Sequence, residues 1–142
     1  MPKLAVLVAC NQVLFDDEVA PSFIGVFVAI DVLPPPDVEI LPNAQNPKQW
    51  FVCSMWLAED KDMNQVFTQK VKVTMPNGIV FGEAAEQFKM DRRSHTVKVQ
   101  IPFMPVGAQG NLAVDVWLES ETRKVADVHR YEINIYHRKR TA

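Results

Sequence analysis

The stretch VFTQKVKVTMPNG, residues 66–78, decides the fold class of this chain. Its apolar side chains share one face of an extended strand and its polar side chains share the other: Phe67, Val71, Val73 and Met75 against Thr68, Lys70, Lys72 and Thr74. Strict alternation of apolar and polar residues is typical of an antiparallel sheet with one face in the core and the other exposed to solvent. Asn77-Gly78 then favours a tight turn, because these residues accept positive φ.

The same pattern recurs along the chain, between breaks rich in proline, glycine and charge. It predicts further strands over 4–15, 23–33, 50–58, 95–103, 112–119 and around 131–135. Residues 79–90 are ambiguous, because 83–87 have helix propensity, but clear caps are missing and we favour a strand there. The 20 Val and 7 Ile against 8 Leu also favour strands, since β-branched residues fit a pleated surface.

Seven or eight short strands without βαβ alternation predict an all-β, antiparallel two-sheet sandwich. The 142 residues suit a single domain over 1–142, with a short basic tail at 137–142. Six valines share a parity in three clean alternations, and we expect them to be buried in one core: Val71, Val73, Val97, Val99, Val114 and Val116. Trp50 and Trp56, in a mostly apolar strand, are expected in the same core.

Three stretches of the sequence resemble a known family. They are LVACNQV (7–13) with SFIGVF (22–27), then 71–78, where a strand runs into a turn with proline and glycine, and 110–119. The chain is similar there to a bacterial family of small, uncharacterised β-sandwich domains, a domain of unknown function. The resemblance implies an immunoglobulin-like sandwich in the bacterial cytoplasm and implies no activity.

The start of the chain has one lysine followed by an apolar run, which a secretory signal would also have. The run resumes after Asn11-Gln12 and has no small-residue cleavage site, so we favour a buried first strand and a cytoplasmic protein. No apolar stretch approaches the roughly 20 residues of a membrane helix, so no membrane partner is expected. A net charge of −2 argues against a nucleic-acid partner.

Cys10 and Cys53 are too few for a disulfide framework and lie inside apolar runs. We expect two buried free thiols, with a Cys10–Cys53 bridge as the alternative. The sequence has no Gly-x-Ser-x-Gly elbow, metal-ligand spacing or phosphate-binding glycine cluster. We therefore expect no enzyme, no cofactor and a non-catalytic module for protein interaction or structure, its partner either another protein or a second copy.

Two acidic turns carry the alternative function, an ion- or small-ligand-binding sandwich. Asp16, Asp17 and Glu18 form one turn, and Glu59, Asp60 and Asp62 form the other. Calcium takes six to eight oxygen ligands, which loop carboxylates supply when they gather at one end of a sandwich. Acidic turns are also common as plain solvated loops, which is the interpretation we favour.

Trp117 falls on the polar face of its predicted strand, between Asp115 and Glu119. A large aromatic side chain on a wet face is either covered by the chain's own loops or part of a contact surface. Tryptophan is enriched at interface hot spots. Trp117, Asp115 and Glu119 are therefore the interface candidates, with Arg123 and Arg138 as basic partners from a second copy.

Overall fold

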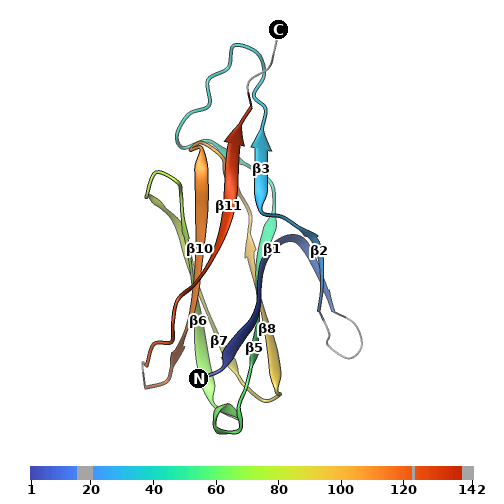
Figure 1. Ribbon diagram of the computed structural model, residues 1–142, viewed down its shortest axis with the longest axis vertical. Coiled ribbons are helices and arrows are strands. Elements are labelled where there is room, and N and C mark those ends of the chain that lie inside the picture. Colours follow the sequence, from blue (N-terminus) through green and yellow to red (C-terminus); the bar gives the residue numbers. More distant parts are fainter. Residues whose placement is uncertain (16–20, 123, 139–142) are drawn as a thin grey trace.

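The structure is a computed structural model that describes residues 1–15, 21–122 and 124–138 (Figure 1). This part of the chain is all-β, with one short 3₁₀ helix, η1 (Asp60–Asp62). The strands are β1 (Lys3–Phe15), β2 (Pro21–Val26), β3 (Ala29–Val32), β4 (Gln45–Asn46), β5 (Trp50–Leu57), β6 (Val66–Thr74), β7 (Val80–Lys89), β8 (Ser94–Ile101), β9 (Met104–Pro105), β10 (Gly110–Ser120) and β11 (His129–His137). No helix in the described ranges is long and apolar enough to cross a membrane.

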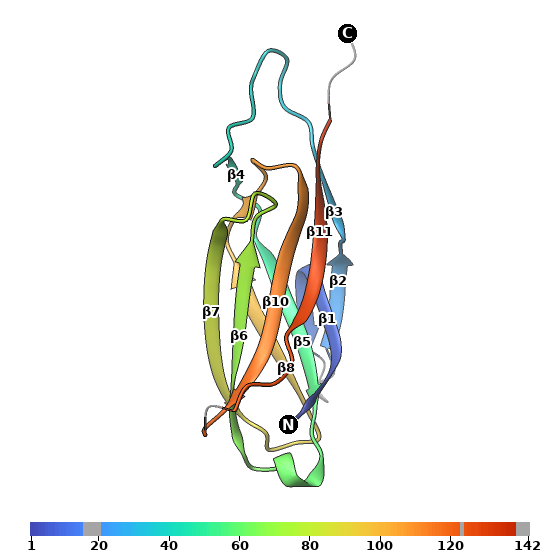
Figure 2. The same cartoon turned by 60° about the vertical axis from the view of Figure 1, so that its left-hand side comes forward.

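The strands form two larger sheets and one small pair. Sheet A has the order β2-β1-β5-β8, sheet B has the order β3-β11-β10-β6-β7, and β4 pairs with β9 (Figure 2). The all-β prediction is confirmed, but seven or eight strands was too few because short segments also pair. The arrangement is not purely antiparallel either, because β3 runs parallel to β11.

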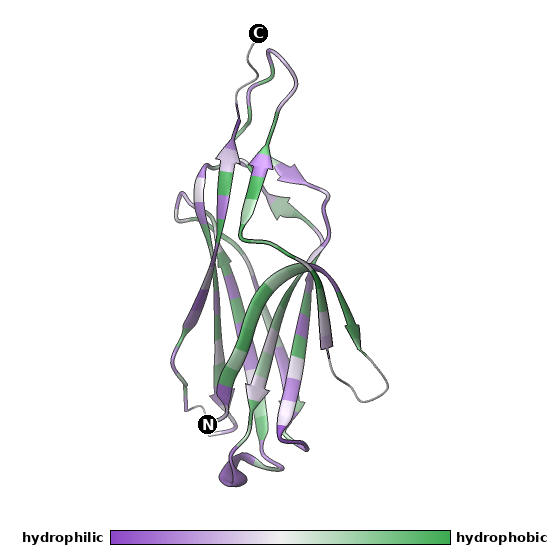
Figure 3. Ribbon diagram, turned by 45° about the vertical axis from the view of Figure 1, so that its right-hand side comes forward, coloured by the Kyte–Doolittle hydropathy of each residue, from purple (hydrophilic) through white to green (hydrophobic). Residues whose placement is uncertain are grey.

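One hydrophobic core takes side chains from both larger sheets. Trp50 and Trp56 of β5 are buried in it, as predicted, together with Val114 of β10. Five of the six valines named above are buried, and Val99 is partly buried against the same core. The parity of the three alternating strands is therefore confirmed. Figure 3 shows the resulting change between apolar and polar residues along the strands.

The predicted strand over 23–33 is in fact two strands in different sheets. The chain leaves sheet A at Phe27, whose N–H donates to the carbonyl of Ala9 on β1 at 3.0 Å. It joins sheet B at Val28, whose carbonyl accepts from the N–H of Asn134 on β11 at 2.8 Å. The Tyr131 hydroxyl also donates to the Phe27 carbonyl at 2.6 Å. A continuous apolar run gave no sign of this change of hydrogen-bond partner.

Strand β1 pairs with different strands along its length. Its first part, to Cys10, pairs with β5, and its last part, from Cys10, pairs with β2. The strand bends between these parts, and the hairpin of β1 and β2 diverges from the rest of sheet A (Figure 3). Gly25 permits the bend, because it has φ +69° and a Cβ there would lie 2.4 Å from Asn11 Nδ2.

The segment over 79–90 is the strand we favoured, so the helical alternative was wrong. Val80–Lys89 pairs along β6, with a bulge between Val73 and Thr74. The bulge inserts a residue into β7 near Phe81, and the inward positions after it are Gly82 and Ala84. Sheet pairing over ten residues overrides the helix propensity of the Ala and Glu residues.

We predict that Val114→Ala lowers the free energy of unfolding by about 1–3 kcal/mol, because Val114 is fully buried and the change leaves a cavity. Val128→Ala is the matched control, since Val128 is 57% exposed and should change stability by less than about 0.5 kcal/mol. Urea denaturation of both variants measures the difference. Equal effects would show that the core parity is wrong.

Candidate functional site

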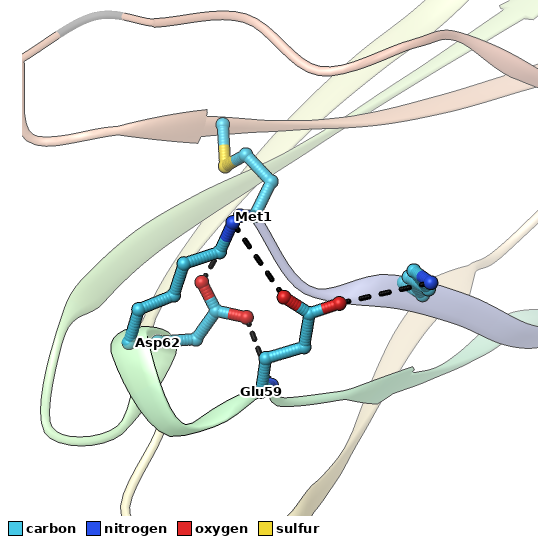
Figure 4. A network of polar contacts seen from close by, with 5 residues as sticks. Met1, Glu59 and Asp62 are labelled. Carbon is cyan, nitrogen blue, oxygen red and sulfur yellow. Dashed lines mark hydrogen bonds and ion pairs between the residues drawn. The ribbon is translucent and has the colours of Figure 1, made fainter.

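The loop after β5 carries three carboxylates, each of which pairs with another group of the chain. Asp62 is buried and accepts from the Glu59 N–H at 2.9 Å, while its other oxygen lies 3.0 Å from the Met1 amine (Figure 4). Glu59 lies 3.6 Å from the amine of Lys3 and 3.5 Å from that of Lys61. Asp60 pairs with Arg93. Each of these carboxylates already has a protein partner.

Asp62 is the most constrained of these acids. Burial by itself would raise the pKa of this carboxyl, but the hydrogen bond from the Glu59 backbone and the charge of the Met1 amine act in the opposite sense. The net effect is a pKa below the usual value. Asp62 is thus a buried carboxylate of η1 whose ion pair with the Met1 amine holds the residues before β1 next to η1.

The ion-binding alternative gains no geometric support from this loop. Among the described residues, no three His, Cys, Asp or Glu side chains are close enough to hold a metal ion. Asp16, Asp17 and Glu18 lie outside the described residues. Leu57 pairs with Lys3, so the loop with Asp60 and Asp62 lies beside the start of β1.

The three interface candidates lie on β10, in two different settings. Asp115 is buried and receives two hydrogen bonds from Arg130, at 2.8 and 3.1 Å, so its basic partner comes from its own chain. Trp117 is half-buried in a shallow hollow, and its Nε1 donates to Glu119 at 3.4 Å. Of the two expected basic partners, Arg138 pairs with Asp31 at 3.0 Å, and Arg123 lies outside the described residues.

The three histidines lie in separate settings. His95 stacks on Phe88 with ring centroids 4.3 Å apart, and burial lowers its pKa. His129 makes an edge contact with Trp56, and His137 Nε2 lies 2.6 Å from the Val106 carbonyl. Cys10 and Cys53 instead pack against each other with Val13. A pairing of either thiol with His129, as a nucleophile and base would need, is not among the contacts of the described residues.

Sequence reasoning missed a polar group at the centre of the core. Gln69 of β6 is buried, and its Oε1 accepts from Trp56 Nε1 at 2.7 Å and from the Ser54 hydroxyl, both on β5. These bonds cross from sheet B to sheet A. The available signal was parity: Gln69 occupies an inward position between Phe67 and Val71.

A cleft of about 240 Å³ opens between the two sheets where β7 and β8 run along their edges. Its lining is mainly apolar and includes Phe81, Val99 and Ile101. The cleft exists because the inward positions of β7 at this level are Gly82 and Ala84, and a Cβ at Gly82 would meet nothing within 4 Å.

Exposed apolar side chains also occur on the opposite side, around β2 (Figure 2). We call this group the β2 strip, and it consists of Leu14, Phe15, Ile24, Val26 and Val28, which are 44–63% exposed. No charged residue occurs from Pro21 to Ile30. Within the described part of the chain, strand β2 is also an edge of sheet A, where an outward row of backbone groups has no strand partner and apolar side chains are exposed.

No family model matches the chain, and no curated protein matches it.

We predict that Asp62→Asn destabilises the protein near neutral pH, on the order of 1 kcal/mol, because the Met1 amine loses its carboxylate partner. The folded-state pKa is depressed, so the stabilisation is present above the unfolded pKa of about 3.9 and is lost as the pH falls through the lower folded value. Urea denaturation at neutral and acidic pH should show a difference between the two proteins that shrinks below about pH 4. A difference that grows on acidification would contradict the assignment.

Proposed function

We propose that this protein is a non-catalytic, immunoglobulin-like β-sandwich module that associates with a second copy of itself through strand β2. The observation that carries this proposal is the β2 strip, an uncharged edge with exposed apolar side chains. The shared core of sheets A and B supports the sandwich assignment. The proposal favours self-association over the ion-binding alternative, because the described carboxylates of the acidic loop have partners within the chain.

The four edges of the two larger sheets differ in how they are protected from pairing. Natural proteins block exposed edges with charged side chains or keep them very short. Strand β7 carries Glu83, Glu86 and Lys89, strand β8 carries Lys98, and β3 has four residues with Asp31 among them. Strand β2 has six residues and no charge. It is therefore the edge on which a second polypeptide meets the least electrostatic and solvation cost.

A second copy suits this edge because the strand is neutral. In a two-fold contact the same patch serves both subunits, so any charge on β2 would approach its own copy. Antiparallel pairing of two β2 strands would join the two four-stranded A sheets into one continuous sheet. Paired residues of an antiparallel hairpin share a face, and consecutive pairs alternate between the two faces. The pairs Leu14–Ser22 and Gln12–Ile24 therefore lie on one face of the hairpin, and the pair Val13–Phe23 lies on the other. In the joined sheet, the apolar side chains of Leu14 and Ile24 would lie beside those of the second copy on the same face.

We predict a reversible dimer whose dissociation constant rises at least tenfold in Ile24→Lys, a change of about 1.4 kcal/mol or more, because two lysines then meet at the edge. Ile79→Lys is the matched control: Ile79 is 59% exposed in the β6–β7 turn, away from β2, and the chemical change is identical. Sedimentation equilibrium over a range of concentrations measures both, and thermal melts check that each variant folds.

Three outcomes would overturn this assignment. The first is a wild-type protein that stays a monomer at every concentration tested. The second is an Ile79→Lys variant whose dimer is weakened as much as that of Ile24→Lys. The third is loss of the dimer in Trp117→Ser with no change in Ile24→Lys, which would place the interface on the outer face of β10.

A further inference from the structure

The sulfur atoms of Cys10 and Cys53 lie 3.6 Å apart. The residues belong to the neighbouring strands β1 and β5, where Cys10 pairs with Phe51 and Cys53 pairs with Val8. The cysteines are therefore diagonal neighbours on one face of sheet A. Both are free thiols and both are fully buried, as the sequence predicted. The contact itself depends on the strand register and on the bend in β1.

A small cluster separate from the main core encloses the two thiols. Val13 is buried with them, and Val8, Phe23 and Phe51 pack around them. Val13 and Phe23 belong to the β1–β2 hairpin, which thus covers Cys53 on the outer face of sheet A. Burial raises the pKa of the Cys53 thiol, and the neighbouring Cys10 raises it further. Reaction of the pair with a reagent in solution therefore requires the hairpin to move away.

We propose that Cys10 and Cys53 form a modification site, a thiol pair that a small-molecule disulfide such as oxidised glutathione converts to an intramolecular disulfide. A disulfide bond is about 2.05 Å long, so the two sulfur atoms must approach by about 1.5 Å. The sulfur–sulfur contact gives the second thiol a high effective concentration for closing the disulfide once a mixed disulfide has formed.

The chemistry proceeds in two exchange steps. The thiolate of one cysteine attacks a sulfur of oxidised glutathione, forming a mixed disulfide and releasing one glutathione thiolate. The second cysteine loses its proton and attacks the sulfur of the first, releasing the second glutathione. The two protein thiols lose two protons and two electrons in total, and the oxidant is reduced to two glutathione thiols. Cys10 and Cys53 are buried and are not part of the β2 strip, but the hairpin that must move to expose them carries strand β2.

The test treats the folded, full-length protein with excess oxidised glutathione, followed by acid quenching and intact mass measurement without reductant. The expected product has lost two hydrogen atoms and carries no glutathione. Its rate of formation should level off as the oxidant concentration rises, because opening of the hairpin becomes limiting. Cys53→Ser is the control and should accumulate a stable glutathione adduct on Cys10, because the resolving thiol is missing.

Two results would overturn the proposal: wild type that stays fully reduced after prolonged treatment, or wild type that accumulates stable adducts like those of Cys53→Ser. If Cys53→Ser does not fold, the wild-type mass alone decides between disulfide, adduct and unreacted protein. Sedimentation of the reduced protein tests self-association separately, so failure of one proposal leaves the other standing.

Discussion

The structure depends on the first of the points where the chain passes from sheet A to sheet B, at Phe27 and Val28. At Phe27 the backbone N–H is still bonded to β1 of sheet A, and one residue later the Val28 carbonyl is bonded to β11 of sheet B. The ring of Phe27 packs edge-on against Trp50 at 5.9 Å, and its carbonyl accepts from Tyr131. Phe27 and Val28 thereby contact three strands that are far apart in the sequence: β1, β5 and β11. Buried backbone groups need partners, so this double attachment fixes how the two sheets face each other.

The crossing makes the two long sides of the molecule different. On one side the continuous chain from β2 to β3 connects the sheets directly, and the β1–β2 hairpin bends outward around the thiols. On the other side β7 and β8 are joined only by the turn beyond Lys89, and small residues at Gly82 and Ala84 leave the cleft open. The apolar edge and the apolar cleft therefore lie on opposite sides, and the edge that lacks charge is the one next to the crossing.

Side-chain alternation was enough to predict the all-β class, the buried tryptophans and the parity of the valines, because one face of each strand must leave water. It could not separate β2 from β3, since an apolar run looks the same whichever sheet it joins. Nor could it show that Asp115 meets Arg130, that Gln69 bridges two sheets, or that two cysteines on strands far apart in the sequence touch. These contacts depend on the register between strands, which a single sequence does not contain.

The exposed apolar β2 strip could not be predicted for a related reason. Its residues are of the same types as core residues and differ from them only in their position at the edge of a sheet.

The parallel pairing of β3 with β11 has a consequence for how the chain reaches this structure. Ala29 meets Asn134, so sheet B gains its last strand only after nearly the whole described chain has been made. Contacts between such distant segments carry a large loop-closure cost and form late in folding. During synthesis, β10 and the apolar β2–β3 segment must therefore wait without this partner, exposed to other nascent chains. Until β11 has been made, the apolar β2–β3 segment lacks this strand partner, and exposed apolar surface of this kind favours association with other chains.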